Sequence, residues 1–175
     1  MASERGKGRG CNNEMTMKDT DQEYLRQAIA LARAGVSKGD GGPFGAVIVN
    51  AQGEVVGRGW NRVLATNDPT AHAEMTAIRD ACGNLDHFQL EGCTIYSSSE
   101  PCPMCLGAIY WARPARLVFA CLRTDAARIG FDDQLIYQEI NLPFEERGIP
   151  TEHVPVDGSD APLQDWEEKE DKILF

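Results

Sequence analysis

Two short segments of the chain carry side chains that could bind a metal ion and move protons. Residues 71–74, AHAE, contain His72 and Glu74, and residues 101–105, PCPMC, contain Cys102 and Cys105. An imidazole and two thiolates suit Zn²⁺, and three protein ligands leave a fourth position for water, as in catalytic zinc sites. Zinc lowers the pKa of such a water to about 7. The segments therefore predict metal-assisted hydrolysis.

Glu74 is the candidate proton carrier. It lies two residues after His72, so in the first turn of a helix its carboxylate can overhang the water position without sharing the direction of the ligand. A carboxylate there can take a proton from water and return it to a leaving group. The positive end of a helix would also favour the thiolate forms of Cys102 and Cys105.

The C-x-x-C pair has two other interpretations, a redox dithiol or half of a structural zinc site. A redox pair does not account for the His-x-Glu motif thirty residues upstream. A structural site needs a fourth ligand, and the candidates Cys82, His87 and Cys93 lack paired spacing. We therefore favour a catalytic Zn²⁺ site.

Composition limits the classes of partner. The chain has 175 residues, a net charge of −10 and a pI near 4.7. This length supports one domain with its own core. A nucleic-acid binder normally presents Lys and Arg to phosphates, so the acidic balance favours a small-molecule substrate and no nucleic acid. We expect a cytoplasmic location and no membrane association, because the sequence shows no secretory signal and no membrane-spanning apolar run.

The elements that must position the site alternate between strand and helix. Apolar runs and turn residues predict strands over 44–50, 54–61, 93–99 and 116–121, and helices over 24–36, 71–82 and 104–112. This alternation predicts an α/β fold. Helices that follow adjacent parallel strands begin at the same edge of a sheet, so we expect His72 and the two cysteines to converge there.

Local signals set the expected boundaries of these elements. Residues 1–19 are polar and aperiodic and are expected to form a disordered leader. Thr20 resembles an N-cap, with Glu23 three residues later. Gly83 is expected to end the helix that carries His72, and the tail from residue 165 to 175 is expected to form an acidic helix.

The His-x-Glu and Pro-Cys-x-x-Cys motifs are typical of zinc-dependent nucleobase deaminases. The resemblance extends over residues 20–175, which would form a single deaminase domain, and is greatest to the bacterial guanine deaminase branch of the cytidine deaminase-like superfamily. The segments that carry it are GGPFGAVIV, NDPTAHAEMTAIRDAC, EPCPMCLGAIYWARP and GFDDQLIYQEI. It implies a three-layer α/β/α fold with a central mixed sheet of about five strands.

The same resemblance implies the chemistry. His72, Cys102 and Cys105 would hold Zn²⁺, and Glu74 would carry protons while water converts guanine to xanthine and ammonia. Alternatives that remain open are a tRNA adenosine deaminase, a deaminase of cytosine, guanosine or ammeline, and a non-catalytic zinc scaffold. The acidic tail argues against tRNA, and the intact Glu74 argues against a scaffold.

Several residues are candidates for binding the base. Asn61 matches a position at which the superfamily uses an amide to hold the ring, although it could simply cap a turn. Phe44 and Trp111 could enclose the base between them, although each could belong to the core. Ala73, between two site residues, is also a candidate.

The last part of the chain supplies the remaining candidates. Asp133, next to Asp132, is a candidate acceptor for purine N–H groups, with surface solvation or helix capping as the alternative; Glu139 is a second candidate. The resemblance also implies a homodimer in which the tail, about residues 160–175, is exchanged between subunits, and Phe175 closes the pocket of the partner. A frayed tail is the alternative.

Overall fold

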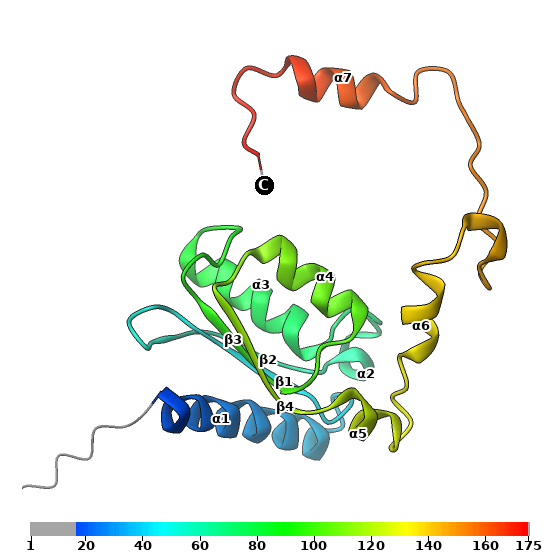
Figure 1. Cartoon of the computed structure of the whole chain (residues 1–175). Coiled ribbons are helices and arrows are strands. Elements are labelled where there is room, and N and C mark those ends of the chain that lie inside the picture. Colours follow the sequence, from blue (N-terminus) through cyan, green and yellow to red (C-terminus); the bar gives the residue numbers. More distant parts are fainter. Residues whose placement is uncertain (1–16, 175) are drawn as a thin grey trace, which may run out of the picture.

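A four-stranded sheet is the centre of the computed structural model, which describes residues 17–174 (Figure 1). The strands are β1 (Gly45–Val49), β2 (Val55–Trp60), β3 (Thr94–Ser99) and β4 (Arg116–Cys121). The helices are α1 (Met17–Lys38), α2 (Val63–Thr66), α3 (Ala73–Leu85), α4 (Pro103–Ala112), α5 (Arg123–Ala127), α6 (Gln134–Glu139), the 3₁₀ turn η1 (Phe144–Glu146) and α7 (Ala161–Glu168). All four expected strands are present.

The sheet has the strand order β2-β1-β3-β4 and is mixed. β1 is antiparallel to both β2 and β3, whereas β3 and β4 are parallel and joined through α4. The described residues contain four strands, not about five. The helices that carry the site, α3 and α4, follow β2 and β3, which share a direction but are separated by β1. The expectation of adjacent parallel strands was therefore wrong, although both helices still begin at the same edge of the sheet.

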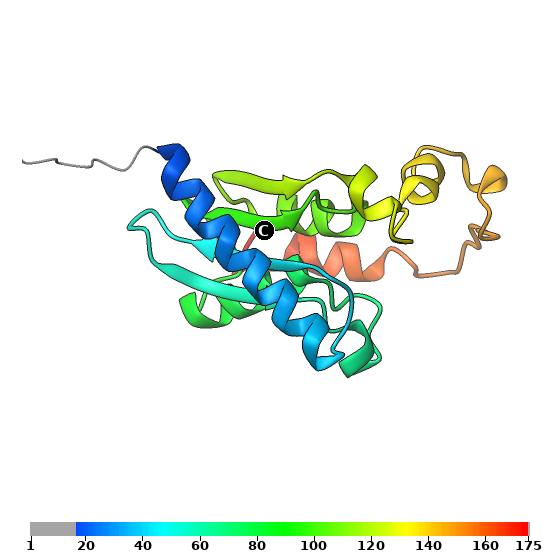
Figure 2. The ribbon, with the colours of Figure 1, turned by 90° about the horizontal axis from the view of Figure 1, so that it is seen from below.

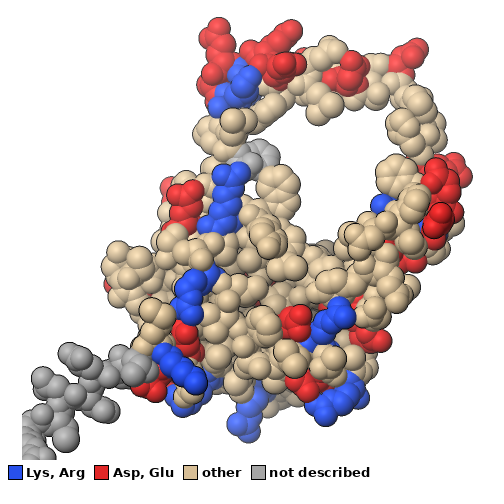
Figure 3. Space-filling view, viewed as in Figure 1, with Lys and Arg blue, Asp and Glu red and all other residues tan. Residues whose placement is uncertain are grey.

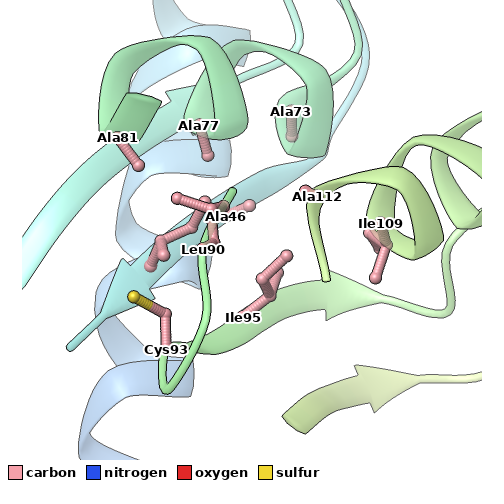
Figure 4. Close-up of a cluster of buried hydrophobic side chains, with 10 residues drawn as sticks. Ala46, Ala73, Ala77, Ala81, Leu90, Cys93, Ile95, Ile109 and Ala112 are labelled. Carbon is pink, nitrogen blue, oxygen red and sulfur yellow. The ribbon is translucent and has the colours of Figure 1, made fainter. Parts of the chain in front are cut away.

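Helices cover both faces of the sheet, which confirms the three-layer α/β/α arrangement. α1 crosses one face (Figure 2), where Tyr24 and Leu25 pack against Val47, Val49 and Tyr96. α3 and α4 cover the other face (Figures 1 and 4). The buried side chains of that face are Ala46, Ile48, Ala73, Ala77, Ala81, Leu90, Cys93, Ile95, Ile109 and Ala112.

Small residues allow α3 to lie close to β2. A Cβ atom on Gly57 would come within 2.6 Å of the Ala77 carbonyl oxygen, and a Cβ on Gly59 within 2.2 Å of the Ala73 carbonyl oxygen. Contacts this short do not occur in real structures, so only glycine fits at these two strand positions. Gly59 thereby determines how near the first turn of α3 lies to the sheet.

Three boundaries differ from the sequence-based expectations. α1 begins at Met17 instead of Thr20, so its first turn includes part of the expected leader. α3 continues through Gly83 to Leu85 and is capped by Asp86 in the left-handed conformation. The helix of the tail begins earlier, at Ala161, where Pro162 suits a first turn, and it ends at Glu168. Among the described residues, none of the helices combines the length and the hydropathy that a membrane span needs.

The segment after β4 differs from the rest of the chain in its packing. From α6 onward the chain runs away from the sheet and then back, so that the tail arches over the α3–α4 side with open space beneath it (Figures 1 and 3). Many of its large apolar side chains are exposed, namely Leu135, Ile140, Phe144, Ile149, Val154, Val156, Leu163, Trp166, Ile173 and Leu174.

Candidate zinc and substrate site

Three candidate metal ligands meet where α3 and α4 begin. His72 and Cys102 are the N-cap residues of the two helices, and Cys105 lies in the first turn of α4. The His72 Nδ1 atom is 3.5 Å from the Sγ atoms of both cysteines, and the three ligand atoms all lie within 4.8 Å of one another. With Zn–N near 2.0–2.1 Å and Zn–S near 2.3 Å, tetrahedral coordination puts nitrogen and sulfur about 3.5 Å apart. The side chains therefore fit a Zn²⁺ ion.

The electrostatics of the same side chains also favour a cation. Hydrogen bonding from the Cys105 thiol and from His72 lowers the pKa of Cys102 to about 4. The pKa of Cys105 is raised, because its thiol bonds to Cys102, because it is buried and because Glu74 is near. Without a cation only one thiol would ionise. A divalent cation compensates both thiolates, which is how a metal ion inverts local pKa preferences.

Glu74 lies beside these ligands and is almost fully buried, with 5% of its surface exposed. The Ser97 hydroxyl donates a hydrogen bond of 3.0 Å to Glu74 Oε1 and so fixes the carboxylate from β3. Burial is the main cause that raises the pKa of Glu74. A carboxyl group with a raised pKa holds a proton more readily than an exposed one, which suits a group that must take up and give back a proton.

A cavity of about 550 Å³ opens in front of the metal ligands. Its lining comes from the residues just before β1 and just after β2, from α2, from the starts of α3 and α4, and from the segment that runs from α5 to α6. The predicted residues among them are Phe44, Asn61, His72, Glu74, Cys102 and Asp133. The volume suits a small-molecule ligand.

The family of cytidine and deoxycytidylate deaminase zinc-binding regions matches residues 18–121, more than half of the chain. The chain belongs to this deaminase family. The matched region contains α1, all four strands and the helices that carry the three candidate ligands. The predicted fold class and the zinc cofactor are therefore confirmed.

Among individual proteins, the chain is similar to guanine deaminases and, at lower identity, to tRNA-specific adenosine deaminases. The chain is 54% identical to guanine deaminase of Bacillus subtilis over 83% of this chain and 92% of that protein. The X-ray structure of guanine deaminase from Bacillus subtilis superposes with a TM-score of 0.85 at 52% identity, covering 87% of this chain and 97% of that one. A tRNA-specific adenosine deaminase of Haemophilus influenzae is 39% identical over 65% of this chain and 68% of that protein.

A further solved structure contains a bound base analogue. It is a mutant of the protein NE0047 in complex with 8-azaguanine, with a TM-score of 0.62 and 33% identity, and the match covers 65% of each chain. The structure of a guanine deaminase from Nitrosomonas europaea superposes with a TM-score of 0.59 at 34% identity, covering 63% of this chain and 64% of that one.

Asn61 lies in this deaminase pocket and is 4% exposed. Its Oδ1 atom accepts hydrogen bonds from the backbone N–H of Gly42 at 3.1 Å and of Val63 at 3.3 Å. Asn61 thus holds the loop before β1 and the turn after β2. With Oδ1 used in this way, the Nδ2 hydrogens remain to face a ligand. Gly41 is required beside it, because a Cβ there would come within 2.1 Å of Asn61 Oδ1.

The apolar wall of the pocket is built from Phe44 and Phe131 instead of Phe44 and Trp111. The two phenylalanine rings lie edge to face, with centroids 5.0 Å apart and planes at 90°. Trp111 lies on α4, is 64% exposed and does not line this pocket. The sequence does not predict Phe131, although this residue directly precedes the acidic pair Asp132 and Asp133.

The structure separates the two candidate acceptors for purine N–H groups. Asp132 and Asp133 both line the pocket. Glu139 does not; its Oε2 atom accepts a 2.6 Å hydrogen bond from the backbone N–H of Gly148, so its carboxylate closes a turn. Burial raises the pKa of Asp133, and the charge of Arg123 opposes that effect. Arg123 also lines the pocket and was not predicted.

Two other candidates do not line the pocket. Ala73 is fully buried in the core between α3 and the sheet. It affects the site through the position of the helix backbone. Phe175 lies outside the described residues.

Proposed function

We propose that the protein catalyses the hydrolytic deamination of guanine to xanthine and ammonia with a bound Zn²⁺ ion. The observation that supports this most directly is one pocket in which His72 and Cys102, two of the three grouped metal ligands, lie with Glu74, Asn61 and Asp133. The similarity to guanine deaminase of Bacillus subtilis, over 83% of the chain, supports the choice of base.

Water addition and amine departure need a group that carries protons. A Zn²⁺ ion held by His72, Cys102 and Cys105 supplies the Lewis acidity for hydrolysis. Glu74 accepts a proton from the attacking water and passes it to a ring nitrogen as the C2–O bond forms. It then transfers the remaining hydroxyl proton to the amine nitrogen on C2, so that the C2–N bond breaks and ammonia leaves while the water oxygen stays on the ring as a carbonyl. The hydrogen bond from Ser97 holds Glu74 in place through both transfers.

Polar groups of opposite character can orient the planar base. The Nδ2 hydrogens of Asn61 suit a ring or carbonyl acceptor of guanine. The carboxylate of Asp133 suits its N–H donors, and a site that pairs each polar group discriminates strongly against bases lacking them. Phe44 supplies an apolar surface for the ring.

The main alternative is a tRNA adenosine deaminase, because such enzymes also match this chain. That match covers 65% of the chain at 39% identity, less than the match to guanine deaminase. The net charge of −10 and the acidic side chains along the tail (Figure 3) are also unfavourable for binding an anticodon loop.

The zinc-loaded protein should be incubated with guanine, guanosine, cytosine, ammeline or an adenosine-containing anticodon stem-loop while ammonia is measured. We expect ammonia and xanthine from guanine. Glu74→Gln should retain zinc and the fold but lose about 10²–10⁴-fold in turnover, the usual contribution of proton transfer. Release from the stem-loop alone would contradict the choice of substrate, and release from none would favour a zinc scaffold.

We also propose a homodimer in which the tail, about residues 160–175, closes the pocket of the partner. Supporting observations are the exposed apolar side chains of the tail and its arch over the α3–α4 side (Figure 3). On that side α4 presents Tyr110 and Trp111, which are 76% and 64% exposed. Apolar surface of this extent usually indicates an interface, and a second copy would bury it.

Mixed dimers can test the exchange of the tail. One subunit would carry Glu74→Gln with a complete tail, and the other would carry Glu74 but end at Ser159. In a swapped mixed dimer, the intact carboxylate receives the tail of the inactive subunit, so activity should exceed that of either parent. No gain in a mixed dimer verified by light scattering would contradict the exchange.

Two further proposals concern the whole chain. We propose that residues 20–175 form one deaminase domain after a leader. We also propose that the protein works in the cytoplasm, where reducing conditions keep the ligand thiols free. The cysteines of the described residues, Cys82, Cys93, Cys102, Cys105 and Cys121, are free thiols.

A further inference from the structure

Arg123 stands out among the pocket residues because it is the one Lys or Arg among the described residues that line the cavity. It is the first residue of α5, and only Leu122 separates it from the end of β4. Its backbone N–H donates a 2.9 Å hydrogen bond to Glu100 Oε2, and Glu100 lies two residues before the zinc ligand Cys102. The backbone of Arg123 is therefore tied to the catalytic core.

The side chain of Arg123 extends in the other direction, to α6. Its Nη2 atom donates a 2.9 Å hydrogen bond to Gln134 Oε1, and its guanidinium lies over the Tyr137 ring, 4.5 Å from the centroid. Asp133, the N-cap residue of α6, directly precedes Gln134. One residue thus connects the core to the short helix that presents the candidate purine acceptor.

We propose that Arg123 is a positioning residue for substrate recognition, which fixes α6 against the core so that the Asp133 carboxylate faces the base. This inference rests on the proposed function, because it assigns Arg123 a role in binding guanine. Arg123 has no part in proton transfer, which belongs to Glu74.

The charges around Asp133 give Arg123 a second effect. Burial raises the pKa of Asp133, and Cys102 and Asp132 act in the same direction, whereas Arg123 lowers it. Tyr137 and Glu100 are further titratable groups beside Arg123, and Glu139 lies at the end of α6, where its carboxylate bonds to the backbone N–H of Gly148. An ionised carboxylate accepts N–H hydrogen bonds with both oxygens and more strongly than the neutral acid does. Removing the guanidinium should therefore leave Asp133 protonated up to a higher pH and weaken binding on the acid side.

Arg123→Gln tests both effects. We expect KM for guanine to rise about tenfold, equivalent to about 1.4 kcal/mol, with kcat nearly unchanged. The acid limb of the kcat/KM profile should move to higher pH. Arg123→Lys keeps the charge but loses the planar fork and the stacking on Tyr137, so it should restore the acid limb while KM stays raised.

Hydrogen exchange gives a readout that does not depend on activity. Amides of residues 131–140 should exchange faster in both Arg123 variants than in the wild type, while those of β1 and β3 remain unchanged. The matched control is Arg128→Gln, which removes an arginine of the same segment that pairs with Asp125 and does not line the pocket; it should behave like the wild type.

The outcomes separate this inference from the proposed function. The role of Arg123 alone would be overturned if the wild type turns over guanine and Arg123→Gln has the same KM, the same acid limb of the pH profile and the same hydrogen exchange as the wild type. Wild-type protein that does not turn over guanine would overturn the proposed function, and the exchange comparison would still decide whether Arg123 fixes α6. If Arg123→Gln does not fold, exchange in Arg123→Lys decides: unchanged protection of residues 131–140 would refute the inference.

Discussion

Gly59 provides a test of how closely the fold and the site depend on each other. A Cβ atom at this position would lie 2.2 Å from the Ala73 carbonyl oxygen and 2.4 Å from both the Ala77 backbone nitrogen and Thr76 Oγ1. To restore an ordinary van der Waals separation, α3 would have to move away from β2 by about 1 Å. Because Ala73 begins α3, this movement would carry the adjacent ligand His72 with it.

The expected cost of Gly59→Ala has two parts. Overpacking of this kind destabilises a protein by about 1–3 kcal/mol, which for a chain of this size lowers Tm by about 2–12 °C. A displacement of about 1 Å at the first turn of α3 would also separate His72 from the two sulfur ligands and move Glu74. Misplacement on this scale can reduce kcat/KM by about 10²-fold, and zinc affinity should fall as well.

The assay compares thermal unfolding, bound zinc and guanine turnover between Gly59→Ala and Gly83→Ala. Gly83 lies on the same helix, and a Cβ there meets no atom within 4 Å. Alanine should therefore stabilise α3 by about 0.5–1 kcal/mol without affecting turnover. If Gly59→Ala keeps the Tm, zinc content and kcat/KM of the wild type, then close packing of α3 on β2 does not position the site.

Three other predictions concern the site and the acid stability of the fold. Ser97→Ala removes the hydrogen bond to Glu74 and should lower kcat about 10- to 100-fold, since a bond to a charged group contributes about 1.5–3 kcal/mol. The control variant Ser99→Ala removes a buried hydroxyl with no partner among the described residues and should keep the activity and Tm of the wild type. Equal losses of kcat in both variants would refute this role of Ser97. Protein stripped of metal by a chelator should regain turnover with Zn²⁺ but not with Mg²⁺, because sulfur ligands prefer the softer ion; recovery with Mg²⁺ would contradict the thiolate site. The hydrogen bond from Arg116 lowers the pKa of Asp21 below its ordinary value of 3.8. The ionised Asp21 therefore stabilises the fold above pH 3.8, and this stabilisation is lost on acidification. The Tm difference between the wild type and Asp21→Asn should shrink below pH 3.8, and a constant difference would exclude this linkage.

The metal site could be predicted from the sequence because its determinants are local. His72 and Glu74 occupy one helix start, and Cys102 and Cys105 occupy another, so short motifs fix the residue types and their spacing. The apolar runs of the strands were equally clear. The order of the strands in the sheet could not be predicted in the same way. Two helices can begin at the same edge of a sheet whether or not another strand lies between the strands before them, and here β1 lies between β2 and β3.

The substrate side of the pocket was less predictable, because it comes from the weakly patterned segment after β4. The sequence predicts Trp111, on the apolar helix α4, as the aromatic partner of Phe44. In the structure the chain after β4 turns so that the ring of Phe131 contacts Phe44. Composition does not reveal that turn. Arg123 was missed for a related reason: a single arginine after a strand resembles a surface residue until its contacts with α6 are known.

The two helix starts also show how the fold accommodates concentrated negative charge. His72 and Cys102 both occupy N-cap positions with extended backbone, and neither side chain caps its helix by a hydrogen bond. A Ser or Asp at either position would stabilise the helix more. Because ligands take the place of caps, the positive ends of two helix dipoles face the site. These partial charges favour the Cys102 thiolate before a metal ion binds. The positions at which the chain forgoes helix capping are therefore the positions at which its catalytic metal is held.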